Sequence, residues 1–319
     1  MKSRIPLLVV ACVVAVAACL PAADAVQLKR SGDTVEVVIE GQPFTTFYFG
    51  TDSPKPYLHP LRAASGKVVT RGFPMIKDDA EEIRTKYQDH PHHRGLFYAH
   101  GDVNGVDFWA EGSAEKGRIV FRSLDQLKGG ATGVLSAIFD WVAPGDKKLL
   151  TETKRLVFSG RADARIIDVE ETLQAGKEAV KLGDTKEGTF AIRVAAPLAP
   201  KNGATFVNSE GGKNEKEIWG KRAAWVDYYG QVGGETVGIA VFDHPTNPKH
   251  PTYWHARAYG LDAVNPFGEH DYYNDKTRDG SITIQPDGRL TFRYRVYIHA
   301  GDTTAGKVAD EYKKYAAGK

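Results

Sequence analysis

Cysteine is scarce in this sequence: the 319 residues include two, Cys12 and Cys19. Both lie near the N-terminus, within an apolar run at residues 5–20 that follows a lysine and an arginine. The run has sixteen residues, fewer than the roughly 20 that a membrane-spanning helix needs. Residues 23–25, Ala-Asp-Ala, then offer a small-residue cleavage site. We therefore expect residues 1–25 to be a signal peptide and the mature chain to have no membrane span.

A second interpretation of the leader stays open. Residues 16–19, Val-Ala-Ala-Cys, resemble a lipobox, in which case the leader ends before Cys19 and that cysteine carries a lipid anchor. Both interpretations predict export, either to the periplasm or to the outer membrane as a lipoprotein. Cleavage after Ala25 would leave no thiol, which excludes disulfides, cysteine nucleophiles and thiolate metal ligands from the mature chain.

Several other sequence signals are missing. No long basic run is present and the formal net charge is +2, so nucleic acid is not an expected partner. The sequence has no nucleophile elbow, glycine-rich phosphate loop, dinucleotide fingerprint or H-E-x-x-H helix. We therefore expect no cofactor, although a divalent metal bound by histidines stays open.

Strand signals recur along the rest of the chain, which has 33 Gly, 14 Phe and 14 Tyr. The clearest strand is residues 289–299, where apolar residues from Leu290 to Ile298 alternate with polar ones, as in a half-buried antiparallel strand. Further strands are predicted at residues 34–39, 44–49, 95–100, 117–124, 132–142, 148–159, 164–173, 187–194, 222–229, 235–243, 252–258 and 281–284.

These patterns predict an all-β fold. We expect residues 26–319 to form a single domain, one large antiparallel β-sandwich of a supersandwich-like kind with long rim loops. Two helices are expected, at residues 78–87 and at residues 304–317, the second with Thr304 as its N-cap. Its apolar stripe predicts packing on the sandwich. Trp141, inside an alternating strand, is expected in the core.

The most informative stretch runs from Asp89 to His100, in which four of the ten histidines fall within twelve residues. Its Asp-His-Pro opening is repeated at residues 243–245. Imidazole and carboxylate together are suited to acid–base chemistry near neutral pH. We expect both Asp-His-Pro segments on one rim of the sandwich, with a catalytic set of His92, His93, Asp243 and His244. The competing interpretation is that these histidines are hydrogen-bonded structure.

Other residues near these segments are expected to bind substrate. Arginine offers fixed donors for oxygen atoms, and a flat indole face suits a sugar ring. The expected substrate-binding residues are His90, Arg94, Trp109, Glu187, Arg193, Trp254, His255, Arg257 and Asn265. For Arg193, a structural role is an equal alternative. A metal would be held by His92 and His93 with His59, His100 or His255, through nitrogen.

Several segments together resemble the PmoA-like proteins, a bacterial family of unsettled function common among exported proteins of polysaccharide degraders. They are residues 55–57, 89–95, 103–109, 243–248, 254–257 and 265–268. The resemblance runs from about Lys55 to the last strand. It implies a sandwich similar to those of the galactose-mutarotase type, which use histidine and carboxylate groups on a concave sheet. A membrane oxygenase subunit would need several apolar spans that this chain lacks.

The sequence thus predicts an exported carbohydrate-active enzyme that uses His and Asp acid–base chemistry on a glycoside or sugar derivative, as a lyase, hydrolase or epimerase. Two other classes stay open: a glycan-binding protein without catalysis, and a histidine-ligated, metal-dependent oxidative enzyme. The expected partner is a carbohydrate, either a small sugar or an oligosaccharide.

Overall fold

The computed structural model describes residues 25–318, which form two large stacked β-sheets. The predicted leader lies outside the described residues, except for Ala25. One sheet has seven strands, in the spatial order β1 (Val26–Ser31), β2 (Thr34–Ile39), β3 (Gln42–Tyr48), β4 (Tyr57–His59), β5 (Leu96–His100), β11 (Gly188–Arg193) and β17 (Leu261–Val264). The other has eight, in the order β12 (Thr205–Asn208), β14 (Trp225–Val232), β15 (Glu235–Asp243), β19 (Arg289–Ala300), β9 (Ala164–Ala175), β8 (Lys148–Arg161), β7 (Gly133–Val142) and β6 (Arg118–Lys128).

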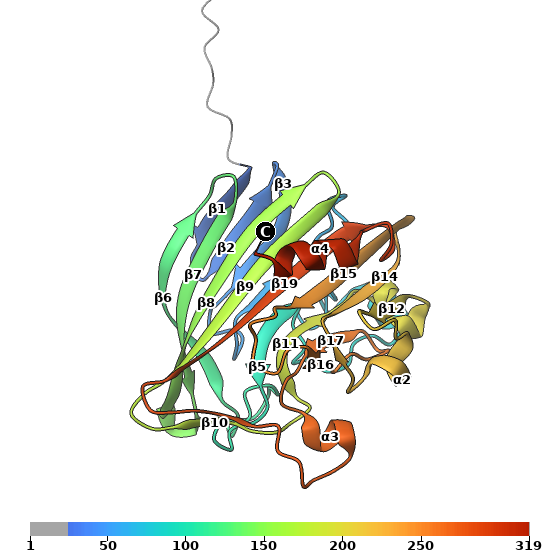
Figure 1. The fold of residues 1–319 in the computed structure, drawn as a ribbon. Helices are drawn as coiled ribbons and strands as arrows, with labels where there is room; N and C mark the ends of the chain where they lie inside the picture. Colours follow the sequence, from blue (N-terminus) through green and yellow to red (C-terminus); the bar gives the residue numbers. More distant parts are fainter. Residues whose placement is uncertain (1–24, 319) are drawn as a thin grey trace, which may run out of the picture.

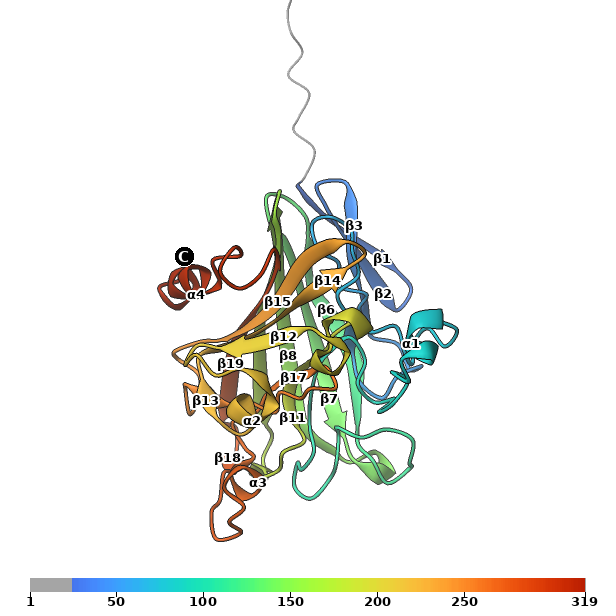
Figure 2. The same cartoon turned by 90° about the vertical axis from the view of Figure 1, so that its right-hand side faces the viewer.

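Short elements fill the connections between these strands. Two small ladders pair β10 (Val180–Leu182) with β18 (Ile282–Ile284) and β13 (Arg222–Ala223) with β16 (Thr252–Tyr253). The helices are α1 (Ala80–Arg84), α2 (Asn214–Ile218), α3 (Glu269–Tyr273) and α4 (Val308–Ala316), with single 3₁₀ turns at Pro144–Asp146, Ala196–Leu198 and Pro200–Asn202. Helices α1 and α4 lie on opposite sides of the sandwich (Figure 2). Among residues 25–318, no helix combines the length and apolar character that crossing a membrane requires.

The core lies between the two sheets, where aromatic rings from opposite layers meet. Phe47 of β3 contacts Phe139 of β7 with ring centroids 6.2 Å apart. Phe190 of β11 stacks on Tyr294 of β19 at 4.6 Å. Figure 1 shows the blue strands β1–β3 of the smaller sheet behind the green strands β6–β9 of the larger. The predicted all-β antiparallel sandwich with a C-terminal helix is confirmed, and Trp141 is fully buried as expected.

Most predicted strands agree with the structure, and β2 and β15 have the predicted limits. The segment 252–258 is different, because regular strand stops at Tyr253. Arg257 N–H donates to the carbonyl of Leu261, and the intervening Gly260 has φ +87°, so the chain reverses there. A strand prediction based on composition did not include this turn. Strands β1, β4, β10, β12 and β17 and helices α2 and α3 were not predicted.

Helix α4 explains why strand β19 is buried on both faces near its end. The core face is apolar as predicted, but Tyr297 and His299 on the other face are also buried. Helix α4 crosses this outer face of the larger sheet (Figure 1), and Val308 and Tyr315 pack there against Phe242 and Tyr297. The helix begins after Lys307, not after Thr304 as predicted, because residues 303–307 form turns before it.

A charged cluster lies inside the core, on the inward faces of β8 and β9. The Lys154 ammonium contacts the carboxylate of Glu171 and lies 3.1 Å from that of Glu152. Glu152 also accepts a 2.6 Å hydrogen bond from the Trp141 indole. Burial, together with the neighbouring Glu152 and against the charge of Lys154, raises the pKa of Glu171 well above its usual value. One ammonium thus stabilises two carboxyl groups out of contact with water.

Replacing Lys154 with methionine should therefore lower the free energy of unfolding by about 3–5 kcal/mol, because two buried carboxyl groups lose their cation. Denaturant unfolding measures this change. The matched control is Arg155→Met, since Arg155 is the next residue and is exposed; it should change stability by at most about 0.5 kcal/mol. Equal effects of the two substitutions would contradict a stabilising role for the cluster.

Candidate functional site

A pocket of about 380 Å³ opens beside the loop that precedes β5. Four separate segments of the chain line it, and each contains at least one residue that was singled out from the sequence. The lining residues are His90, His92, His93, Asp107, Trp109, Ala110, Lys186, Glu187, His255, Arg257 and Tyr259. The structure therefore brings the first histidine run together with the segment around His255.

The loop is held in place by the carboxylate of Asp89. Oδ1 of Asp89 lies 2.9 Å from Nη1 of Arg71 and 2.5 Å from Nη2 of Arg193. Both guanidinium groups are fully buried. Arg71 also donates to the backbone carbonyls of Tyr87, Asp89, His90 and His93, so one side chain follows the course of the whole loop. Burial alone would raise the pKa of Asp89, but a hydrogen bond from His90 and the charges of Arg193 and Arg71 hold it well below its usual value.

His93, at the base of the pocket, is a neutral hydrogen-bond donor. Nη1 of Arg193 lies 3.2 Å from Nδ1 of His93. A guanidinium group can only donate, so Nδ1 accepts and the imidazole proton is on Nε2. Burial, and then the charges of His92 and Arg193, lower the pKa of His93 well below 6.5. Its Nε2 is buried and has no hydrogen-bond partner among residues 25–318.

His255 repeats this arrangement from the other side of the pocket. The indole Nε1 of Trp219, which can only donate, lies 3.1 Å from Nδ1 of His255. The imidazole proton of His255 is therefore also on Nε2. Burial, followed by the charges of Arg257 and Lys186, lowers the pKa of His255 to about 3. In both His93 and His255, which come from distant segments, the imidazole proton is therefore fixed on Nε2.

Flat rings surround these donors. The rings of His90, His93 and Tyr259 are nearly parallel and lie beside one another: the His90 centroid is 5.0 Å from that of His93 and 5.1 Å from that of Tyr259, and those two are 6.4 Å apart. His92 meets His93 edge-on at 4.4 Å, and burial and the charge of Lys55 lower its pKa to about 4. Trp109 meets His93 edge-on at 5.6 Å. Aromatic rings therefore form part of the pocket wall, beside the charged side chains of Asp107, Lys186, Glu187 and Arg257.

Two carboxylates line the pocket, and their surroundings differ. Asp107 accepts hydrogen bonds from the backbone of Trp109 and Ala110 and from Lys116. Burial opposes this effect, but these bonds lower the pKa of Asp107. Glu187 has a single side-chain partner among the described residues, its neighbour Lys186. Glu187 is thus the carboxylate with free acceptor positions.

Asp243 and His244 do not lie in this pocket. Asp243 is buried at the end of β15, where it contacts His250 and Asn247, each at 2.7 Å. Burial, against the hydrogen bonds from these two residues, raises its pKa. His244 lies in a separate hollow with Arg295 and Tyr315. The two Asp-His-Pro segments are apart because β15 belongs to the larger sheet, whereas the first segment leads into β5 of the smaller one.

Three further predicted residues make contacts elsewhere. Trp254 is fully buried and donates to the carbonyl of Ala223. Asn265 is buried and holds backbone groups of Thr185 and Phe267. Arg94 forms a two-pronged ion pair with Glu111. Arg193 is also absent from the pocket wall, but it supports the pocket by contacting His93 and Asp89 from behind.

The predicted metal ligands are not assembled in the described part of the chain. Among residues 25–318, no three His, Cys, Asp or Glu side chains are grouped so as to hold a metal. His59 and His100 are buried on strands β4 and β5. For His93 and His255, binding a metal through Nε2 would move the proton to Nδ1, where Arg193 and Trp219 already donate. These two imidazoles are therefore unsuited to metal binding.

Sequence reasoning missed several residues that shape the site, among them Tyr259, Lys186 and Arg71. Tyr259 follows Arg257 by two positions, which was a usable signal. Arg71 lies in a segment without regular periodicity, and its role depends on contacts with residues 16 to 22 positions later.

Comparison with models of protein families shows to which family the chain belongs. Residues 34–313 match the model of a family of unknown function, DUF6807. The chain belongs to this family. The comparisons give no support to the resemblance to PmoA-like proteins. No curated protein matches this DUF6807 member in sequence.

Solved structures with a similar fold have low sequence identity. The α-galactosidase of Lactobacillus brevis has 8% identity and a TM-score of 0.40, and the match covers 88% of this chain. The chain spans 40% of the length of that α-galactosidase. A galactose mutarotase-like protein of Clostridium acetobutylicum has 10% identity and a TM-score of 0.37, with 86% of this chain and 95% of that one covered. A galactose mutarotase related enzyme of Lactobacillus acidophilus has 6% identity and a TM-score of 0.34, with 87% and 98% covered.

Replacing Asp89 with asparagine should destabilise the DUF6807 member by about 2–4 kcal/mol, because two buried guanidinium groups would lose their shared anion. The value is below that of a fully buried pair because Asp89 is partly exposed. Denaturant unfolding measures the loss. The control Asp163→Asn breaks an ion pair of two exposed side chains and should cost at most about 1 kcal/mol. A loss no larger in Asp89→Asn would show that the network does not hold the loop.

The buried imidazoles should make the fold sensitive to mild acid. Burial lowers the pKa of His59 and His100 to about 4 and that of His255 to about 3. The unfolded chain binds protons at these side chains near pH 6.5, so it holds more protons than the folded chain between pH 6.5 and about 4. The free energy of unfolding should therefore fall as pH falls through this window, by up to about 1.4 kcal/mol per pH unit for each imidazole.

Denaturant unfolding at a series of pH values tests this slope. His59→Gln should make the decline shallower by up to the contribution of one imidazole. A decline that His59→Gln does not change would rule out the neutral state of that side chain as the cause.

Proposed function

We propose that the pocket binds a carbohydrate and transfers a proton on it, with Glu187 as the base and His93 and His255 as hydrogen-bond donors. The observation that carries this proposal is the pair of imidazoles fixed as Nε2–H donors in a pocket that also holds a carboxylate with free acceptor positions. The near-parallel rings of His90 and Tyr259 add flat faces on which the C–H side of a sugar ring can stack.

The roles in this proposal differ from the original expectation for the histidines. A neutral imidazole whose Nδ1 is already bonded to a donor has no free lone pair, so His93 and His255 cannot act as bases. Their N–H groups can stabilise a sugar oxygen on which negative charge develops, as neutral imidazoles with lowered pKa values do in other proton-transfer sites. Glu187 would accept the proton and return it to the product.

This chemistry favours an epimerase or a lyase over a hydrolase. Hydrolysis of a glycosidic bond uses two carboxyl groups, one of them protonated so that it can act as an acid. The second carboxylate of this pocket, Asp107, has a lowered pKa and three donors that hold it ionised. It is therefore poorly suited to donate a proton at neutral pH.

Replacing Glu187 with glutamine should remove catalysis and keep binding. The assay incubates a panel of reducing sugars and uronates with the protein in D₂O and follows anomer exchange, deuterium uptake at carbon and elimination products by NMR. For the sugar that reacts, Glu187→Gln should lower the rate by at least about 100-fold. The dissociation constant, read from tryptophan fluorescence, should change by less than about threefold.

The matched control is Glu178→Gln, at an exposed glutamate paired with Lys147 at the surface; it should keep full activity. Tight sugar binding without any of the three reactions would identify a glycan-binding protein without catalysis. Full activity in Glu187→Gln would remove Glu187 from the mechanism.

A further inference from the structure

The acidic and basic side chains around the pocket are unequal in number. Two carboxylates are each shared by two cations: Asp89 by Arg71 and Arg193, and Glu111 by Lys55 and Arg94. The other three carboxylates each have one basic partner, in the pairs Asp107–Lys116, Glu187–Lys186 and Glu215–Arg257. A sixth carboxylate, Glu82, lies near Arg71 and accepts hydrogen bonds from the backbone of Gly72 and Phe73. Seven basic side chains therefore face six carboxylates around the pocket, and neutral imidazoles do not offset this excess of positive charge.

The excess lies directly behind the pocket wall. The side chains of Lys55, Arg71 and Arg193 are fully buried. Lys55 donates to the backbone carbonyl of Trp109 at 2.6 Å, and Arg193 donates to His93. Buried charge without full compensation is costly. An anion bound in the pocket would reduce that cost, whereas a neutral sugar would not.

Two hydrogen-bond donors at the pocket wall also have no partner. Nε2 of His93 and Nε1 of Trp109 are both buried and unbonded among the described residues. Trp109 carries a donor and no acceptor, and His93 has its acceptor nitrogen occupied by Arg193. A group that only accepts hydrogen bonds fits such donors better than a hydroxyl, which brings a proton of its own. Oxygen atoms of a carboxylate or a sulfate ester have this property.

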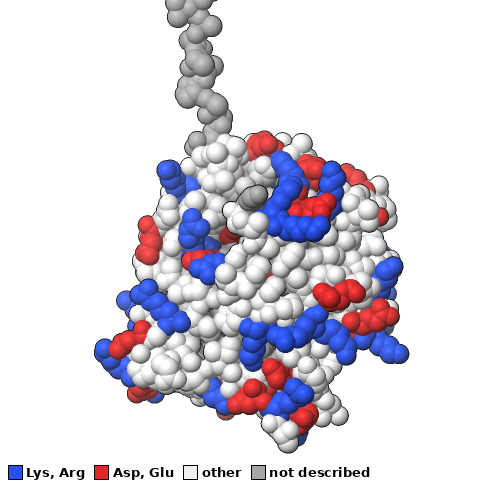
Figure 3. All heavy atoms as spheres, in the orientation of Figure 1, with Lys and Arg blue, Asp and Glu red and all other residues white. Residues whose placement is uncertain are grey.

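From these observations we infer that the pocket takes an acidic sugar, whose carboxylate or sulfate oxygens accept hydrogen bonds from the His93 and Trp109 side. The inference rests on the proposed carbohydrate function and names the class of sugar. Basic and acidic side chains are interspersed on the face of the molecule in Figure 3, and the formal net charge of the whole chain is +2.

Isothermal titration at low salt, with matched pairs of sugars, tests the inference. The pairs are D-glucuronate and D-glucose, D-galacturonate and D-galactose, and galactose 6-sulfate and D-galactose. The acidic member of at least one pair should bind at least about tenfold more tightly, and the advantage should shrink as ionic strength rises. Preference for uronates or for the sulfate ester distinguishes the two anions.

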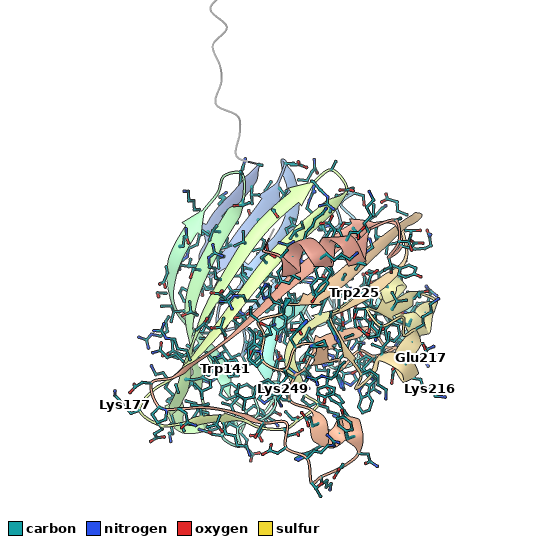
Figure 4. All side chains as sticks on the ribbon, viewed as in Figure 1. Trp141, Lys177, Lys216, Glu217, Trp225 and Lys249 are labelled. Carbon is teal, nitrogen blue, oxygen red and sulfur yellow. The ribbon has the colours of Figure 1, made fainter. Side chains whose placement is uncertain are left out.

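Lys186→Gln removes one cation from the wall and should reduce the preference for the acidic sugar several-fold. Lys177→Gln is the matched control: Lys177 is exposed, and Figure 4 shows it at the end of the molecule opposite Lys216 and Glu217 of α2. It should leave the preference unchanged. As a second measurement, the bound anion should raise the pKa of His92 from about 4, followed by NMR titration.

Equal binding of acidic and neutral sugars would overturn the inference and leave the proposed carbohydrate function standing. Absence of binding by every sugar of the three pairs would overturn both. A preference for the acid that Lys177→Gln reduces as much as Lys186→Gln would also overturn the inference, because attraction by the whole protein would then explain it.

Discussion

The meeting of two buried guanidinium groups at one carboxylate is the interaction on which the site depends. Asp89 alone would be a loop residue of no special kind, but Arg71 and Arg193 fix it from two directions. Arg71 then binds the carbonyls of the same loop, and Arg193 decides which nitrogen of His93 carries the proton. The shape of the loop, the tautomer of His93 and the positive charge behind the pocket therefore all depend on the contacts of these two arginines.

Burial has a double effect on the imidazoles of the pocket. It removes their charge, which would make them weak as proton carriers, and it leaves them as directed N–H groups in surroundings of low polarity, where hydrogen bonds are strong. Trp219 does for His255 what Arg193 does for His93, with a neutral donor in place of a charged one. The two sides of the pocket thus present the same chemical group although they use different supports.

The sequence allowed the sandwich to be predicted because alternation is local. Residues 235–243 carry their own pattern, and the strand has the predicted limits. The first histidine run was likewise visible as a cluster. The partner segment was only half predicted: His255 and Arg257 line the pocket, but Asp243 and His244 do not. Which sheet a strand joins depends on distant pairings, and an Asp-His-Pro motif contains no information about them. Arg193 could not be assigned because its partners lie about 100 positions away.

The residues that form the pocket are synthesised at different times. Asp89 and Arg193 can meet before the C-terminal strands exist, but His255, Arg257 and Tyr259 leave the ribosome much later. A ligand that requires both sides of the pocket will therefore not bind nascent or truncated chains that lack residues 255–259. Such a ligand would recognise only molecules in which β17, the strand that follows these residues, has already joined the seven-stranded sheet.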